Sequence, residues 1–129
     1  MIRYRRKACS TNQAIAKFDH IARLGQIKMI VAKRFRAARP KLGITSPITH
    51  ECIMVYGEHG TARFEGLCWG YSGEGPRGTH ALLKKCGVPE PLGTEAAFKT
   101  PRMDNEGVDW IITNNGVAGW FIIPAKAVA

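Results

Sequence analysis

The chain has 129 residues, 45% of them hydrophobic and 22% charged, which fits one globular domain and argues against a disordered chain. No run of about 18 apolar residues occurs, so the sequence contains no candidate membrane-spanning helix. The formal net charge of +9 favours a partner that carries negative charge. The first seven residues are basic, but no apolar stretch follows them, so we expect no secretory signal and a cytoplasmic location.

The positive charge is concentrated at the N-terminal end. Residues 1–41 contain twelve basic side chains and one acidic one, whereas residues 42–129 contain seven and nine, so the two parts carry +11 and −2. Seven of the twelve are arginines, whose planar guanidinium groups suit phosphate oxygens. An acidic protein surface and a merely solvated basic tail remain alternatives. We expect residues 1–41 to bind nucleic acid through ten basic residues: Arg3, Arg5, Arg6, Lys7, Lys28, Lys33, Arg34, Arg36, Arg39 and Lys41.

Within this basic segment, the sequence indicates helical structure. Ser10 to Gln13 forms a capping box, and apolar residues at helical spacing follow it as far as Gly25, which is suited to end a helix. Residues 26–38 fit either a strand to about Val31 or a second helix. We favour the helix because helix-forming residues are common there, so residues 1–41 are expected to form a basic helical segment or arm. Pro40 would end that helix, and residues 40–48 would form a loop.

Two hairpins are expected after this segment. The first spans residues 49–71 with a turn at Glu58 to Gly60, and the second spans residues 108–123 with an Asn-Asn-Gly turn. Trp110 and Trp120 could pair across the second hairpin. The sequence therefore predicts a single α+β domain over residues 1–129, with a small, mainly antiparallel sheet of four or five strands in its body, residues 49–124.

A glycine-rich loop at residues 70–78 lies between the two hairpins, and a short helix from Thr79 to Cys86 is expected after it. Residues 88–107 are expected to be mostly loop, with one helical turn at 95–99. Glycine-rich loops before helices let backbone N–H groups approach phosphates, although Glu74 has the wrong charge for this. The alternative is a tight connection that needs glycine for its backbone geometry. The candidate phosphate- or nucleotide-binding residues are Tyr71, Gly73, Gly75, Arg77 and Thr79.

No cofactor or metal is expected, since the histidines are scattered and no C-x-x-C pair occurs among Cys9, Cys52, Cys68 and Cys86. These are expected to be free thiols. The favoured hypothesis is a binding protein for a phosphate-bearing partner, most of all nucleic acid, in the role of a small regulator or inhibitor. A binder of small nucleotides through the glycine-rich loop is the second hypothesis. A small hydrolase or nuclease that uses His80 and Glu74 is the third.

Overall fold

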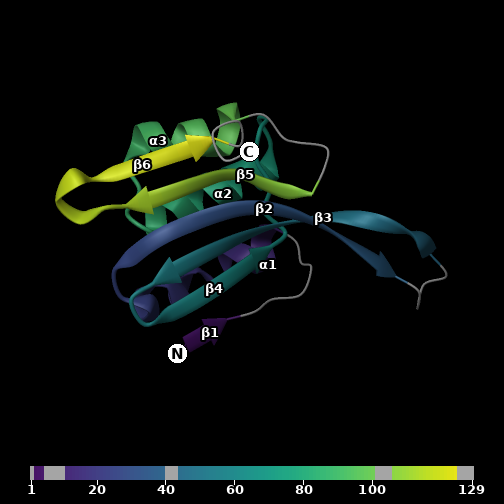
Figure 1. The fold of residues 1–129 in the computed structure, drawn as a ribbon, viewed down its shortest axis with the longest axis horizontal. Coiled ribbons are helices and arrows are strands. Elements are labelled where there is room, and N and C mark those ends of the chain that lie inside the picture. The colour runs from purple at the N-terminus through teal and green to yellow at the C-terminus, as the bar shows by residue number, and fades with distance from the viewer. Residues whose placement is uncertain (1, 5–10, 40–43, 101–105, 125–129) are drawn as a thin grey trace.

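The computed structural model shows two layers, a six-stranded sheet with the helices on one of its faces (Figure 1). This arrangement confirms the α+β class predicted from the sequence. The structure describes residues 2–4, 11–39, 44–100 and 106–124, and within these the side chains of residues 11–35, 50–100 and 106–124.

The strands lie in the order β1-β4-β3-β2-β5-β6, so the long strands β2 and β3 form the middle of the sheet. Among the strands that the structure describes, only β1 pairs in parallel, with β4, and the remaining neighbours are antiparallel. The bounds are Ile2–Tyr4 for β1, Ile27–Arg39 for β2, Ile44–Gly57 for β3, Gly60–Glu65 for β4, Gly107–Asn114 for β5 and Trp120–Pro124 for β6.

The prediction of a second helix over residues 26–38 is wrong, because this segment is strand β2. It pairs with β3 on one side and β5 on the other, and Ile30 and Ala32 are fully buried under the helices. Pairing on both edges and burial outweigh the helix propensity of its residues. In the described residues of the N-terminal segment, the helical parts are α1, Thr11–Ile15, and the 3₁₀ turns of η1, Phe18–Leu24, which end at Gly25 as predicted.

The first predicted hairpin is confirmed as β3 and β4, joined by a two-residue turn at Glu58 and His59. Its bounds differ from the expectation at both ends. The loop predicted for residues 40–48 is wrong over residues 44–48, which belong to β3, and the chain leaves the sheet after Glu65. A carboxylate oxygen of Glu58 accepts a hydrogen bond of 2.8 Å from the backbone N–H of Gln26, which holds the turn against the start of β2.

The second predicted hairpin is confirmed as β5 and β6, but its turn is longer than two residues. The chain makes a 3₁₀ turn, η4 (Gly116–Ala118), before β6 begins. The register therefore places Trp110 opposite Pro124 and Trp120 opposite Asn114, so the expected pairing of the two tryptophans is wrong. Trp110 packs edge-on against Trp69 instead, with ring centroids 6.0 Å apart.

The remaining helices follow β4 and cover the sheet together with α1 (Figure 1). They are α2, Glu74–Lys85; α3, Glu90–Thr94; and η3, a single wide turn over Glu95–Lys99. The predicted helical turn at 95–99 is confirmed, whereas α3 was not predicted and α2 begins five residues before Thr79. The core between the layers contains Ile30, Ile53, Phe64, Trp69, Leu82, Leu83 and Trp110. None of the described helices is long and apolar enough to cross a bilayer.

Candidate nucleic-acid interface

Strands β2 and β3 extend beyond the rest of the sheet as a two-stranded ribbon (Figure 1). Their pairing continues as far as Arg39 and Ile44, whereas β5 pairs with β2 only to Arg34 and β4 pairs with β3 only to Cys52. We call the unflanked residues, 35–39 and 44–51, the ribbon. The segment from residue 33 to residue 49 contains five basic residues and no acidic one, and Glu51 is the one acidic residue in the sequence of the ribbon.

The structure gathers part of the predicted basic set at this ribbon. Lys33 and Arg34 lie at its base, while Arg36 and Arg39 are in the ribbon, in register with Thr49 and Ile44. Arg5, Arg6, Lys7 and Lys41 lie outside the described residues.

Two other predicted residues lie away from the ribbon. Arg3 is in β1 opposite Thr61, near the turn that joins β3 to β4. Lys28 is exposed at the start of β2, where its ammonium group donates a hydrogen bond of 3.3 Å to the side-chain oxygen of Gln26. The ten basic residues therefore do not form one surface.

Arg34 is buried on the helix-covered face and is part of the protein's internal structure. Its guanidinium group forms an ion pair with Asp109, which is also fully buried. The same carboxylate oxygen accepts a hydrogen bond of 2.7 Å from the indole N–H of Trp69. These contacts fix the base of the ribbon to the body, so we do not include Arg34 in the proposed binding surface.

A β-bulge makes this ion pair possible. Ala32 pairs with Trp110 and Lys33 pairs with Val108, which leaves Asp109 as an extra residue in β5. Asp109 and Trp110 are consecutive and both buried. In a regular strand with one face open to solvent, consecutive side chains point to opposite faces, so only one of the two would be buried. Sequence reasoning missed this site, and its only signal was a single carboxylate among the apolar residues from Val108 to Ile112 in β5.

The opposite face of the sheet carries a second group of side chains at the base of the ribbon. Phe35 and His50 stack with their ring centroids 5.3 Å apart, and the guanidinium carbon of Arg63 lies 4.8 Å from the centroid of Phe35. Arg63 also forms an ion pair of 2.8 Å with Glu65. We call Lys33, Phe35, His50, Arg63 and Glu65 the base cluster. Cations and aromatic rings thus lie together where the ribbon leaves the sheet.

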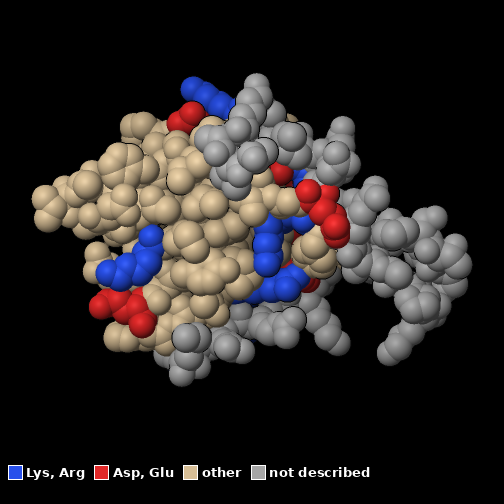
Figure 2. Space-filling model, viewed as in Figure 1, with Lys and Arg blue, Asp and Glu red and all other residues tan. Residues whose placement is uncertain are grey.

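Cys52 lies beneath the base cluster and is fully buried. Burial raises the pKa of its thiol, and the charges of Arg63 and Lys33 act in the opposite direction. The thiol is therefore neutral near pH 7 and acts as a small apolar side chain. Figure 2 shows Lys and Arg atoms on the side from which β2 and β3 project, with Asp and Glu atoms beside them, and a second group of charged atoms at the opposite end of this face.

The glycine-rich segment has a different structure from the expected open loop, because α2 already begins at Glu74. Gly75 and Gly78 lie in the helix where it packs against neighbouring chain. A Cβ atom at Gly75 would lie 2.0 Å from the Sγ of Cys68, and one at Gly78 would lie 2.6 Å from a methyl group of Thr11. The structure thus gives these glycines a packing role that requires no ligand.

The other candidate residues of this segment are divided between interior and surface. Thr79 is fully buried, and its hydroxyl donates a hydrogen bond of 2.6 Å to the carbonyl oxygen of Cys68. Tyr71 and Arg77 are exposed. The hydroxyl of Tyr71 lies 2.9 Å from the Sγ of Cys68, and this contact, aided by burial, raises the pKa of Tyr71. Gly73 directly precedes the helix, and Glu74 occupies its first turn.

His80, a candidate acid or base, pairs with Glu90 of α3, its Nε2 lying 2.8 Å from a carboxylate oxygen. Hydrogen bonds from His80 and Thr94 lower the pKa of Glu90. The His80 ring also lies 5.6 Å from that of Phe98, so this histidine connects α2 with the helical turns after it. No group of three His, Cys, Asp or Glu side chains suited to a metal ion occurs in the described part of the chain.

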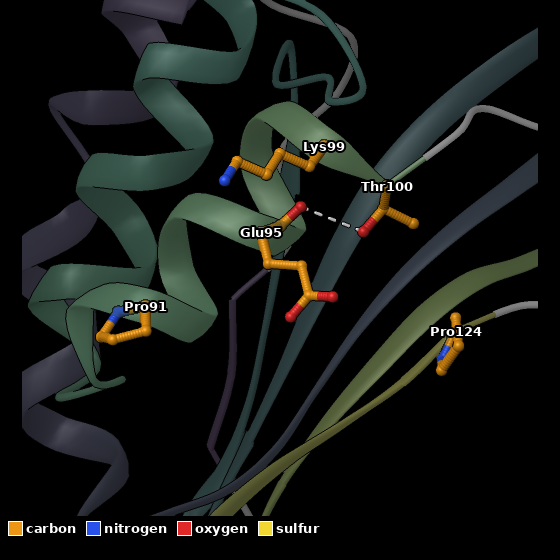
Figure 3. A pocket seen from close by; sticks show the side chains of 5 residues that line it. All are labelled: Pro91, Glu95, Lys99, Thr100 and Pro124. Atoms are coloured by element: carbon orange, nitrogen blue, oxygen red, sulfur yellow. Dashed lines mark hydrogen bonds between the residues drawn. The ribbon is translucent and has the colours of Figure 1, made fainter.

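A shallow hollow of about 330 Å³ lies between η3 and the end of β6, and it is lined by Pro91, Glu95, Lys99, Thr100 and Pro124. In Figure 3 the Glu95 carboxylate points into the space before β6, whereas the Lys99 side chain extends the other way. The hydroxyl of Thr100 donates a hydrogen bond of 3.1 Å to the carbonyl oxygen of Glu95. Neither a histidine nor a cysteine lines this hollow, which leaves the ribbon as the most distinctive surface.

A comparison with protein-family models, curated proteins and solved structures finds no match for this chain.

Proposed function

We propose that this chain binds nucleic acid and holds the phosphate backbone of its partner with the ribbon. The observation that supports this most is the coincidence of charge and shape. The ribbon, which projects beyond the flanking strands, carries Arg36 and Arg39 against one acidic residue, Glu51, and Lys33 lies at its base. A dense group of like charges raises the energy of the folded chain unless an outside anion compensates it.

The ribbon suits this role because a pair of antiparallel strands can enter the major groove of a duplex or follow a single strand. The contacts that we propose are Lys33, Arg36, Arg39 and Lys41. Arg34 instead anchors the base of the ribbon through Asp109 and Trp69. A fixed base reduces the conformational freedom that would be lost on binding.

A small-nucleotide binder is the second candidate, and it would use the segment from Tyr71 to Arg77. The exposure of Tyr71 and Arg77 beside the start of α2 favours it, since a base could stack on one and a phosphate pair with the other. The carboxylate of Glu74 in the first helical turn opposes it. We therefore rank this candidate below the ribbon.

The proposal is tested by reversing charge on the ribbon and, as a matched control, elsewhere. Arg36→Glu with Arg39→Glu should abolish or strongly weaken binding to labelled DNA and RNA oligonucleotides, measured by fluorescence anisotropy over a range of salt concentrations. Lys84→Glu with Lys85→Glu changes the net charge equally at two exposed positions in the last turn of α2 and should have a much smaller effect.

The salt dependence of wild-type binding provides the second measurement. The logarithm of the affinity should fall linearly with the logarithm of salt concentration, by about 0.9 per phosphate contact on a duplex and about 0.7 on a single strand. The ribbon variant should have a shallower slope because it makes fewer such contacts. Equal losses of affinity in the ribbon variant and the α2 variant would mean that net charge alone accounts for binding. A wild-type affinity that does not change with salt concentration would rule the proposal out.

A further inference from the structure

We infer that the nucleic acid held by the ribbon is single-stranded, and that its bases stack on the open face of the sheet beside the base cluster. This inference rests on the proposed function and adds the class of partner. It follows from the apolar and aromatic side chains on the sheet face beside the ribbon.

This face of the sheet is the one that the helices leave uncovered (Figure 1). The alternation of β2 and β3 presents one set of side chains to the helices and the other to this face. Ile30 and Ile53 are in the core, whereas Phe35 and His50 stack outside it. By register, Met29, Val31, Lys33, Phe35, His50, Met54 and Tyr56 share it.

The open face continues across β5 and β6. Ile111 pairs with Val31 and Ile123, so these three residues form one row across neighbouring strands. Phe121 lies one row further from the ribbon, and its side chain is 45% exposed. The face beside the base cluster is therefore apolar and aromatic over several strands. Figure 2 shows it mostly tan between the charged atoms on the side of the ribbon and a second group of charged atoms at the opposite end.

The base cluster already holds its rings in a stacked arrangement. Phe35 and His50 lie within 19° of parallel, and Arg63 lies over the Phe35 ring. Such a pair is ordered before any ligand arrives, so a base that adds to the stack loses its own freedom but requires little rearrangement of the protein. Arginine and aromatic planes are the groups on which unpaired bases stack in proteins.

The partner must therefore offer negative charge to the ribbon and flat apolar groups to the face next to it. A duplex offers the charge, but its base faces are stacked inside. A single strand offers both, because its phosphates and its unpaired bases are accessible together. An acidic protein with an apolar patch is the other occupant of this kind, and the experiment below distinguishes it.

The test compares two probes of equal length, a labelled single-stranded oligo(dT) or oligo(U) and a mixed-sequence duplex, at one salt concentration. The wild-type protein should bind the single strand more tightly. Phe35→Leu, which keeps apolar volume but removes the ring, should weaken single-strand binding by about five-fold or more and leave duplex binding nearly unchanged. Tyr71→Leu removes an exposed aromatic ring in the loop before α2 and should change neither affinity.

A second variant and a stability measurement keep the test informative if Phe35→Leu folds poorly. His50→Leu removes the other ring of the stack, and thermal melting of each variant shows whether the fold is retained. Equal losses for both probes, or no preference for the single strand, would refute the inference while the ribbon proposal stands. Loss with Tyr71→Leu alone would transfer the site to the glycine-rich segment. Binding of an acidic protein but of neither oligonucleotide would refute both proposals.

Discussion

The ribbon and the glycine-rich segment both have compositions that suggest phosphate binding, yet their structures differ. In the glycine-rich segment, Gly75 and Gly78 pack so closely against the same protein that a side chain would collide with it. The hydroxyl of Thr79 donates a hydrogen bond to a backbone carbonyl. At the ribbon, Arg36 and Arg39 lie where the flanking strands have ended, whereas Arg34 at its base is buried and paired with Asp109. Composition alone therefore cannot separate a binding surface from close packing, whereas the position of each residue in the fold can.

The largest expected effect comes from removing the anchor at the base of the ribbon. Asp109→Ala leaves the guanidinium group of Arg34 buried without its counter-charge, which should lower the free energy of unfolding by about 3–5 kcal/mol. Trp69 also loses the acceptor for its indole N–H. Urea unfolding followed by tryptophan fluorescence measures this loss.

The control for this prediction removes both charges together. Arg34→Met with Asp109→Leu leaves no unpaired ion, so it should recover most of the stability that Asp109→Ala loses. Arg36→Glu with Arg39→Glu should by contrast have little effect on stability if those side chains are solvated, as the ribbon proposal requires. A loss below about 1 kcal/mol for Asp109→Ala would mean that the ion pair is not an anchor.

Local sequence signals predicted the hairpins and the N-terminal helical turns, while long-range pairing decided the rest. Residues 27–39 contain both an alternating pattern and many helix formers, and only the strands on either side select between them. The start of α2 was placed too late because glycine and proline usually indicate a loop. Here Gly75 is tolerated in the helix because its missing side chain permits contact with Cys68.

The candidate site could be predicted only in part for the same reason. The concentration of positive charge was evident in the sequence, but its division into buried and surface residues was not. Arg34 and its partner Asp109 are 75 residues apart, and their contact depends on a bulge that no local pattern indicates. The base cluster likewise requires β2, β3 and β4 to be in register before Phe35, His50 and Arg63 come together.

A medium effect is expected at Gly75, where packing and phosphate binding make different predictions. Gly75→Ala would place a methyl group against the Sγ of Cys68, and the resulting overpacking should lower the free energy of unfolding by about 1–3 kcal/mol. Adding Cys68→Ala removes the sulfur and should restore most of that loss. Chemical denaturation of the single and double variants measures both steps.

The binding measurement on the same variants sharpens the comparison between the two regions. If the ribbon is the binding surface, the Gly75→Ala and Cys68→Ala double variant should bind oligonucleotides as the wild-type protein does. An unimpaired stability for Gly75→Ala would contradict the packing role of this glycine. A restored fold with lost binding would instead indicate that backbone N–H groups near the start of α2 contact the ligand.

The smallest effect is expected at Arg77, which is exposed in the first half of α2. A positive charge near the N-terminus of a helix is slightly unfavourable because of the helix dipole, so Arg77→Ala should leave the melting temperature unchanged or raise it slightly. If the ribbon holds the phosphates, this variant should also leave oligonucleotide affinity unchanged, apart from the small general effect of one lost positive charge. Lys99→Ala, at an exposed position in η3, measures that general effect. An affinity loss for Arg77→Ala well beyond that of Lys99→Ala, with an intact fold, would mean that the start of α2 takes part in binding, and the partner would then have to contact both faces of the molecule.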